Sequence, residues 1–145
     1  MPLHRFYYAK GIFSAQDKQE ISERITKIYT SGGLPAFYVI VVFNEVPSDS
    51  IMIGGKPATN FVRVVSQHLA RTMDTYERKQ TVLNALEAAF GPYVKDRGLD
   101  WEIHIEEHSR DTWRLNGLNP PLPNTDAEKL WAKENRPSPF EQSKI

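Results

Sequence analysis

The residue with the most distinctive chemistry in this sequence is Pro2, which directly follows Met1. A penultimate proline is a substrate for methionine removal, and processing would leave a secondary amine at a fixed place on the first strand. An α-amino group titrates near pH ~8, far below lysine, so it can be a neutral base near physiological pH. Met-Pro is also a common start of a polypeptide, so Pro2 alone leaves a catalytic and a structural interpretation open.

The spacing of His104 and His108 invites a metal-site interpretation. On a strand, residues four apart share a face but lie ~13 Å apart along the axis. The pattern places no third ligand beside them, and the absence of cysteine excludes thiolate sites, disulfides and a cysteine nucleophile. We therefore expect neither a metal nor another cofactor.

The charge balance of the chain limits the classes of partner. Its 145 residues contain 18 Lys and Arg against 18 Asp and Glu, whereas a nucleic-acid-binding protein needs a basic face. The longest apolar run, residues 39–43, is far too short to cross a bilayer. The N-terminus also lacks the features of a signal peptide. We expect a cytoplasmic protein with no nucleic-acid or membrane partner.

Residues 2–47 are predicted to form a strand, a helix and a second strand. Residues 3–8 are rich in aromatic side chains and typical of a strand. A helix is expected from the N-cap Ser14 to the stop at Gly32-Gly33, because isoleucines recur between them at helical spacing. Residues 37–46 form a near-continuous apolar run, typical of a strand buried on both faces.

The same order recurs over residues 61–107. A strand at 61–65 is followed by a helix that begins at the capping pair Asp74 and Glu77, and then by a strand at 101–106. Each unit is long enough for a right-handed crossover between parallel strands. We predict an α+β fold with a four-stranded mixed sheet and both helices on one face. The bare face is expected to be apolar and covered by oligomerisation.

The composition changes after residue 118. We expect one domain over 1–118 and an extension over 119–145, which begins as a proline-rich linker. A capping box from Thr125 to Glu128 predicts a short helix that carries Leu130 and Trp131. The tail from Arg136 onward is expected to be loose unless it packs on a neighbouring subunit.

Two fused strand–helix–strand units behind Met-Pro resemble the tautomerase superfamily. The likeness is strongest to the cis-3-chloroacrylic acid dehalogenase group and, within it, to fungal proteins described as oxalocrotonate tautomerases. It covers roughly residues 2–118 and is carried by the stretches at 25–29, 41–50, 68–72 and 113–117. The resemblance implies a homotrimer with the Pro2 amine as the catalytic acid or base.

The resemblance also assigns positions around the substrate. Arg71 stands at a carboxylate-binding arginine, His68 at a second such arginine, and Tyr29 at an active-site histidine. His104 stands in for a tyrosine on the fourth strand, and Trp113 could line the pocket or fill a subunit interface. Each of these residues also has an ordinary structural interpretation, such as an ion pair for Arg71 or helix-end packing for Tyr29.

One departure from the dehalogenase pattern separates two reactions. The water-activating glutamate of that group falls on or beside Leu115, where no carboxylate is available. Hydration needs a base for water, whereas tautomerisation needs one base and a group that stabilises the enolate. We therefore expect a tautomerase acting on a small anionic enol or 2-keto acid. The alternatives are a binding protein with little catalysis, a weak dehalogenase or hydratase, and carbon–carbon bond formation through Pro2.

Overall fold

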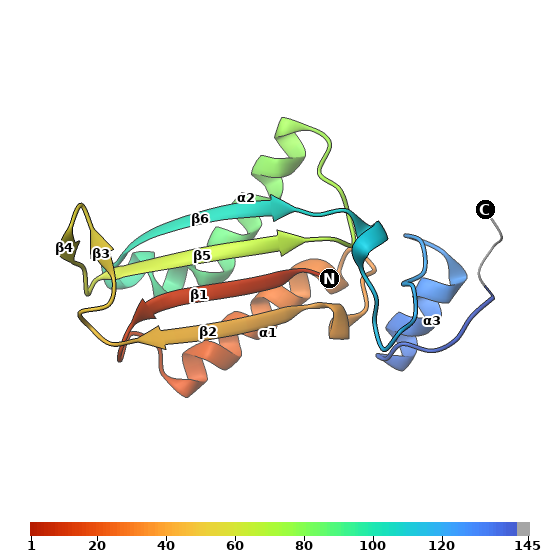
Figure 1. The fold of residues 1–145 in the computed structure, drawn as a ribbon, viewed down its shortest axis with the longest axis horizontal. Helices are drawn as coiled ribbons and strands as arrows, with labels where there is room; N and C mark the ends of the chain where they lie inside the picture. The colour runs from red at the N-terminus through yellow and green to blue at the C-terminus, as the bar shows by residue number, and fades with distance from the viewer. Residues whose placement is uncertain (142–145) are drawn as a thin grey trace.

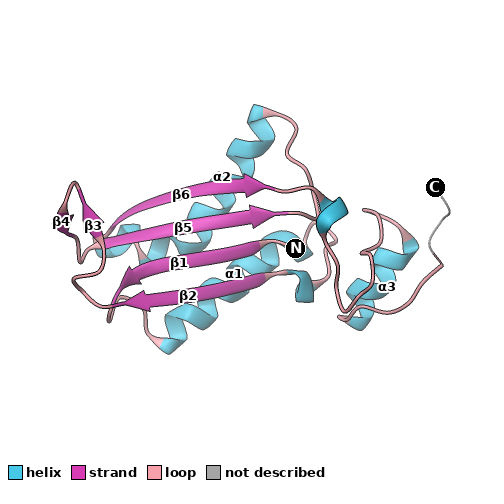
Figure 2. Cartoon of the chain, viewed as in Figure 1, coloured by secondary structure: helices cyan, strands magenta, loops and turns pink. Residues whose placement is uncertain are grey.

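The computed structural model describes residues 1–141 and contains a four-stranded mixed sheet with the order β2-β1-β5-β6 (Figure 1). Its strands are β1 (Leu3–Ala9), β2 (Ile40–Val46), β5 (Phe61–His68) and β6 (Asp100–Glu107). β2 is parallel to β1, β6 is parallel to β5, and the central pair β1 and β5 is antiparallel. The crossover helices α1 (Ala15–Thr30) and α2 (Tyr76–Phe90) cover one face (Figure 2), which confirms the predicted fold.

The helix starts follow from local capping. The Ser14 hydroxyl accepts from the Asp17 amide at 3.1 Å, and the Asp17 carboxylate accepts from the Ser14 amide at 2.9 Å, as the sequence predicts for α1. α2 begins one residue later than predicted. Its N-cap is Thr75, whose hydroxyl accepts from the Arg78 amide at 3.2 Å, so the predicted pair of Asp74 with Glu77 is wrong.

The predicted strand at 37–46 is shorter in the structure. Ala36–Tyr38 forms a 3-10 turn, and β2 begins only at Ile40. The turn directs Phe37 and Tyr38 toward Trp131, with ring centroids 6.1 and 6.3 Å away. The loop that follows β2 also contains a small hairpin, β3 (Met52–Ile53) with β4 (Lys56–Pro57), which the sequence did not predict.

The hydrophobic core lies between the sheet and the two crossover helices. Phe6 stacks on Phe43 of the neighbouring strand at 5.1 Å and meets Phe90 of α2 edge-on at 5.8 Å. Ile21 and Ile25 of α1 are buried in the same cluster. Among residues 1–141, the structure has no helix long and apolar enough to cross a membrane.

The face of the sheet opposite the helices is more polar than the sequence predicts. On this face Arg63 pairs with Glu102, and its Nη2 lies 3.1 Å from His104 Nδ1. Glu106 accepts from Gln67 Nε2 at 2.8 Å. The expectation of an apolar bare face is wrong over β5 and β6, because strand alternation brings their charged residues to this side.

The C-terminal extension is anchored by Trp131 of α3 (Asp126–Glu134), which is fully buried. Its indole Nε1 donates to the carbonyl of Ser138 at 2.7 Å, and Phe140 lies edge-on at 5.8 Å. Residues 136–141 therefore fold back onto α3 and are not a loose tail. The rest of the predicted tail, residues 142–145, lies outside the described residues.

Replacing Trp131 with alanine tests whether the extension is part of the folded unit. Truncating a fully buried tryptophan leaves a large cavity, so the free energy of unfolding should fall by about 3–5 kcal/mol in urea denaturation followed by circular dichroism. The neighbouring Leu130, 41% exposed, is the matched control, and its alanine variant should lose less than about 1 kcal/mol. Equal, small losses for both variants would show that the extension detaches at no cost.

Candidate active site

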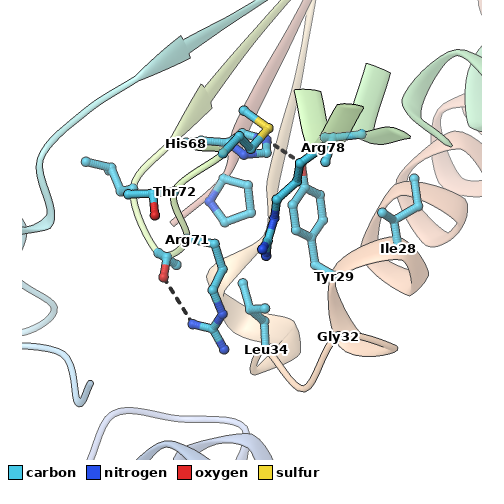
Figure 3. Close-up of a pocket in the computed structure, with 13 residues that line it drawn as sticks. Ile28, Tyr29, Gly32, Leu34, His68, Arg71, Thr72 and Arg78 are labelled. Atoms are coloured by element: carbon cyan, nitrogen blue, oxygen red, sulfur yellow. Dashed lines mark hydrogen bonds between the residues drawn. The ribbon is translucent and has the colours of Figure 1, made fainter. Parts of the chain in front are cut away.

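A small pocket lies at the end of the sheet where β1 begins and β5 ends (Figure 3). Its volume is about 130 Å³, well below the ~300–1,000 Å³ typical of pockets for drug-sized ligands. Pro2, Tyr29, His68, Arg71 and Arg78 supply its polar and chemically active groups, and the remaining lining is mostly apolar. The pocket is therefore suited to a small, polar molecule.

Pro2 is fixed by the sheet itself. Its carbonyl accepts from the Ile40 amide at 3.0 Å, which extends the pairing of β1 with β2 by one residue. Alternation along β1 places Pro2 on the helix-covered side, together with His4 and Phe6. The side chain is buried and lines the pocket. With Met1 attached, the Pro2 nitrogen is a peptide amide without a basic lone pair.

Tyr29 and His68 form a hydrogen-bonded pair in the pocket wall. The Tyr29 hydroxyl lies 2.7 Å from His68 Nε2 (Figure 3), which joins the last turn of α1 to the end of β5. Burial, and then the positive charge of the N-terminus, lower the pKa of His68 to about 4. Burial raises the pKa of Tyr29. Both groups are therefore neutral at pH 7, and His68 offers a hydrogen bond rather than a cation.

His4 lies behind this pair and is a buried polar residue that the sequence analysis missed. Its Nδ1 is 2.5 Å from the Ser66 hydroxyl, and its ring centroid is 5.4 Å from that of Tyr29. Burial, with a smaller effect from His68, lowers the pKa of His4 to about 3. Its position two residues from Pro2, on the same face of β1, is the signal that could have identified it.

The two arginines of the pocket differ in their charge partners. Arg71 donates from Nη1 and Nη2 to the two carboxylate oxygens of Glu128, each at 2.9 Å. Arg78 projects into the pocket, on the side where Arg71 and Tyr29 lie (Figure 3). Within residues 1–141, Arg78 makes no ion pair. Arg78 is therefore the pocket cation whose charge is available to a ligand.

The N-terminus lies in a positive field. Burial, then Arg110, then Arg71 lower the pKa of the Met1 amino group to about 4. A raised pKa of this amino group would need a nearby carboxylate, because an anion favours the protonated form of an amine. A proline amine one residue further along the chain would be held near the same two guanidinium groups.

The structure brings four of the six predicted site residues together: Pro2, Tyr29, His68 and Arg71. His104 is not among the residues that line this pocket. Its side chain is on the opposite face of the sheet, with Nε2 3.3 Å from Glu106 Oε1. Trp113 also lies elsewhere, buried edge-on against Tyr38 at 4.9 Å.

Sequence reasoning missed Arg78, Arg110 and Glu128. Arg78 had a signal, because a cation in the first turn of a helix opposes the helix dipole and such local conflicts are typical of functional positions. Glu128 was predicted as the partner of Thr125 in a capping box. The structure retains the Thr125 cap, with the Glu128 amide donating to its hydroxyl at 3.3 Å, but the Glu128 carboxylate binds Arg71 and the Asn124 amide.

Two fused β-α-β units with a proline at the start of the central strand define the fold of the tautomerase superfamily. The chain matches, over residues 1–136, the family model described as "Putative oxalocrotonate tautomerase enzyme", and it belongs to that family. No curated protein matches the sequence.

Solved structures with the same fold include two with substantial sequence identity. Native RhCC from Rhodococcus jostii is 45% identical, with 95% of this chain and 99% of that chain covered and a TM-score of 0.92. A probable enzyme from the thermophilic fungus Aspergillus fumigatus is 39% identical, with 97% and 98% covered and a TM-score of 0.91. A member of the cis-3-chloroacrylic acid dehalogenase family shares the fold at 15% identity, with 92% and 97% covered and a TM-score of 0.73.

The buried neutral histidines predict a pH-dependent stability. In the unfolded state, His4 and His68 regain the ordinary histidine pKa. As the pH falls from about 6.5 to about 4, the unfolded state therefore binds protons that the folded state does not bind. Each histidine should then lower the free energy of unfolding by about 1.4 kcal/mol per pH unit. Urea unfolding of His4→Asn should show about two-thirds of the wild-type slope over this range, because His68 and the N-terminal amine, whose pKa values are both lowered to about 4, still contribute. An unchanged slope in His4→Asn would contradict the assignment.

Proposed function

We propose that this protein is a tautomerase or isomerase in which the Pro2 amine, after removal of Met1, transfers a proton on a small enol or 2-keto acid. The observation that carries the proposal is the position of Pro2, buried in a small pocket beside Arg71 and Arg78. The amine takes a proton from the carbon next to the carbonyl and returns it at a second position. The positive groups stabilise the enolate that forms between the two steps.

The electrostatics of the N-terminus support a base at neutral pH. A nearby positive charge disfavours the protonated amine, and burial acts in the same direction. Both act on the Met1 amino group, and Arg110 and Arg71 supply the charge. We expect the same two effects to act on a Pro2 amine after removal of Met1 and to favour its neutral form.

The composition of the pocket supports tautomerisation over hydration of a double bond. Among the described residues, none that lines the pocket is an Asp or a Glu, and the carboxylate of the nearby Glu107 accepts from the Met73 amide at 2.7 Å. Leu115, at the position of the dehalogenase glutamate, lies in a tight turn in which its amide donates to the Leu118 carbonyl at 2.9 Å. Tyr29 and His68 remain as neutral hydrogen-bonding groups for the carbonyl of the substrate.

The assembly is proposed from the fold. A fused 4-OT protein forms an asymmetric trimer and shares this fold at 16% identity, with 81% of this chain and 94% of that chain covered and a TM-score of 0.66. The sheet face opposite the helices carries Arg63, Glu102, His104 and Glu106, which could form ion pairs across a subunit contact. We propose a homotrimer that uses this face.

Replacing Pro2 with alanine tests the base. Intact mass first establishes that Met1 is absent from both proteins. Turnover of phenylenolpyruvate or 2-hydroxymuconate, followed by absorbance, should then fall roughly 10²-fold or more, the usual contribution of a positioned general base. The primary amine of alanine remains but is no longer held by a ring. Wild-type turnover in Pro2→Ala would rule out the proposal, provided that both proteins have the same circular dichroism spectrum.

Replacing Arg78 with glutamine tests the anion-binding cation. The loss of a charge-assisted hydrogen bond should raise KM for an anionic substrate roughly tenfold or more, with a smaller effect on kcat. Lys79→Gln is the matched control, since Lys79 is the next residue of α2 but faces Glu107 at 3.8 Å. A KM that rises equally in both variants would indicate a general charge effect instead of a binding site at Arg78.

A further inference from the structure

The C-terminal extension contacts both arginines that act on the N-terminus. The carboxylate of Glu128 in α3 accepts from Arg71 Nη1 and Nη2 at 2.9 Å each. The linker that precedes α3 contacts Arg110, because the carbonyls of Pro120 and Pro121 accept from its Nη2 at 3.3 and 2.7 Å. Two parts of one segment therefore orient two separate guanidinium groups.

The pair of Arg71 and Glu128 is built as a fixed contact. The Glu128 side chain is 3% exposed and that of Arg71 is 21% exposed, so solvent screens the pair little. A bidentate arginine–carboxylate contact fixes the plane of the guanidinium as well as its position. Glu128 is itself held by the Asn124 amide, which donates to Oε2 at 2.8 Å, and by the Thr125 cap of its helix. The Glu128 carboxylate is thus itself held in place, and it can therefore hold Arg71 in a defined orientation.

The charges of the same groups act on a buried hydroxyl. Tyr38 is 1% exposed, and its hydroxyl has no hydrogen-bond partner within residues 1–141. Burial raises the pKa of Tyr38, and Glu128 raises it further, while Arg110 and Arg71 oppose this shift. Arg71 and Arg110 thus act on both the Tyr38 hydroxyl and the chain's N-terminus. The extension therefore contacts the two arginines whose charge acts on the N-terminal amine.

We propose that segment 119–134 is a positioning element of the active site, in which Glu128 fixes Arg71 in the pocket that Pro2 lines and the carbonyls of Pro120 and Pro121 fix Arg110. This inference rests on the proposed function, because it assigns the two arginines to the field of the catalytic Pro2. Glu128 acts through Arg71 and does not contact the substrate. Its pairing also leaves Arg78, rather than Arg71, as the main anchor for a substrate carboxylate.

The test measures the pKa of the N-terminal amine directly. Protein from which Met1 has been removed, verified by intact mass, is labelled with 15N-proline and titrated by NMR. Arg110→Gln and Arg71→Gln should each raise the amine pKa by about 1 unit, the low end of the effect of one neighbouring charge. Asp126→Asn is the matched control on α3, because this carboxylate is 98% exposed and pairs only with Lys129 among the described residues.

The sign of the change in Glu128→Gln decides between two roles. If Glu128 positions Arg71, the released guanidinium leaves the amine, and the pKa rises to that of Arg71→Gln. Combining the two changes should then add nothing further. If Glu128 instead acts only through its own negative charge, Glu128→Gln should lower the pKa of the N-terminal amine. A lowered or an unchanged pKa in Glu128→Gln would overturn the proposal.

A second variant guards against loss of folding in Glu128→Gln. Glu128→Asp keeps the charge but withdraws the carboxylate by one methylene, so the positioning role predicts a raised amine pKa and a purely electrostatic role predicts none. The matching kinetic readout is a pH profile of kcat/KM whose acid limb moves upward in both Glu128 variants. The titration does not depend on turnover, so a protein without tautomerase activity could fail the proposed function while this inference still stands.

Discussion

The whole site depends on the pairing of β1 with strands on both sides. β1 is the first strand of the chain, yet it lies inside the sheet between β2 and β5. A chain terminus usually frays because few contacts hold it. Here the backbone ladder reaches Pro2, whose carbonyl is bound by Ile40, so the start of the chain is as fixed as the centre of the fold. This constraint holds the Pro2 nitrogen at a fixed place in the pocket.

Charge is distributed unevenly around that terminus. Burial keeps His4 and His68 neutral, so the imidazoles contribute hydrogen bonds but no charge at pH 7. The guanidiniums supply the positive field, and one of them, that of Arg71, is paired with the carboxylate of Glu128, which does not itself line the pocket. A base and a cation can coexist in such a small volume because the cation disfavours the protonated form of the base.

The sequence predicted the architecture well because both units have clear periodic signals. The isoleucines of α1, the Ser14 cap and the alternation in β6 each specify their element locally. The prediction was weaker at residues whose backbone conformation or hydrogen-bond partner depends on contacts with residues far along the chain. The turn at Tyr38 forms because Trp131, far along the chain, packs against it, and the Glu128 carboxylate leaves its expected local partner for Arg71.

The site was predicted in part for the same reason. Pro2, Tyr29, His68 and Arg71 lie near the ends of elements at one edge of the sheet, so their grouping follows from the topology. Arg110 and Glu128 lie in the segment after β6. No periodic pattern in the sequence indicates where this segment runs relative to the sheet. His104 lies away from the pocket because side chains alternate between the two faces along β6. In the register of the sheet, His104 lies beside Val65 of β5, and both side chains are on the face opposite the helices.

The order of synthesis separates the N-terminus in time from the C-terminal extension that contacts Arg71 and Arg110. Met1 and Pro2 leave the ribosome before Glu128 and Trp131, and domains begin to fold as they emerge. In the folded protein Met1 packs partly against the core. A peptidase has freest access to the first peptide bond while the last helix is still unmade. The extension thus reaches Arg71 and Arg110 after the first peptide bond has been exposed to a peptidase.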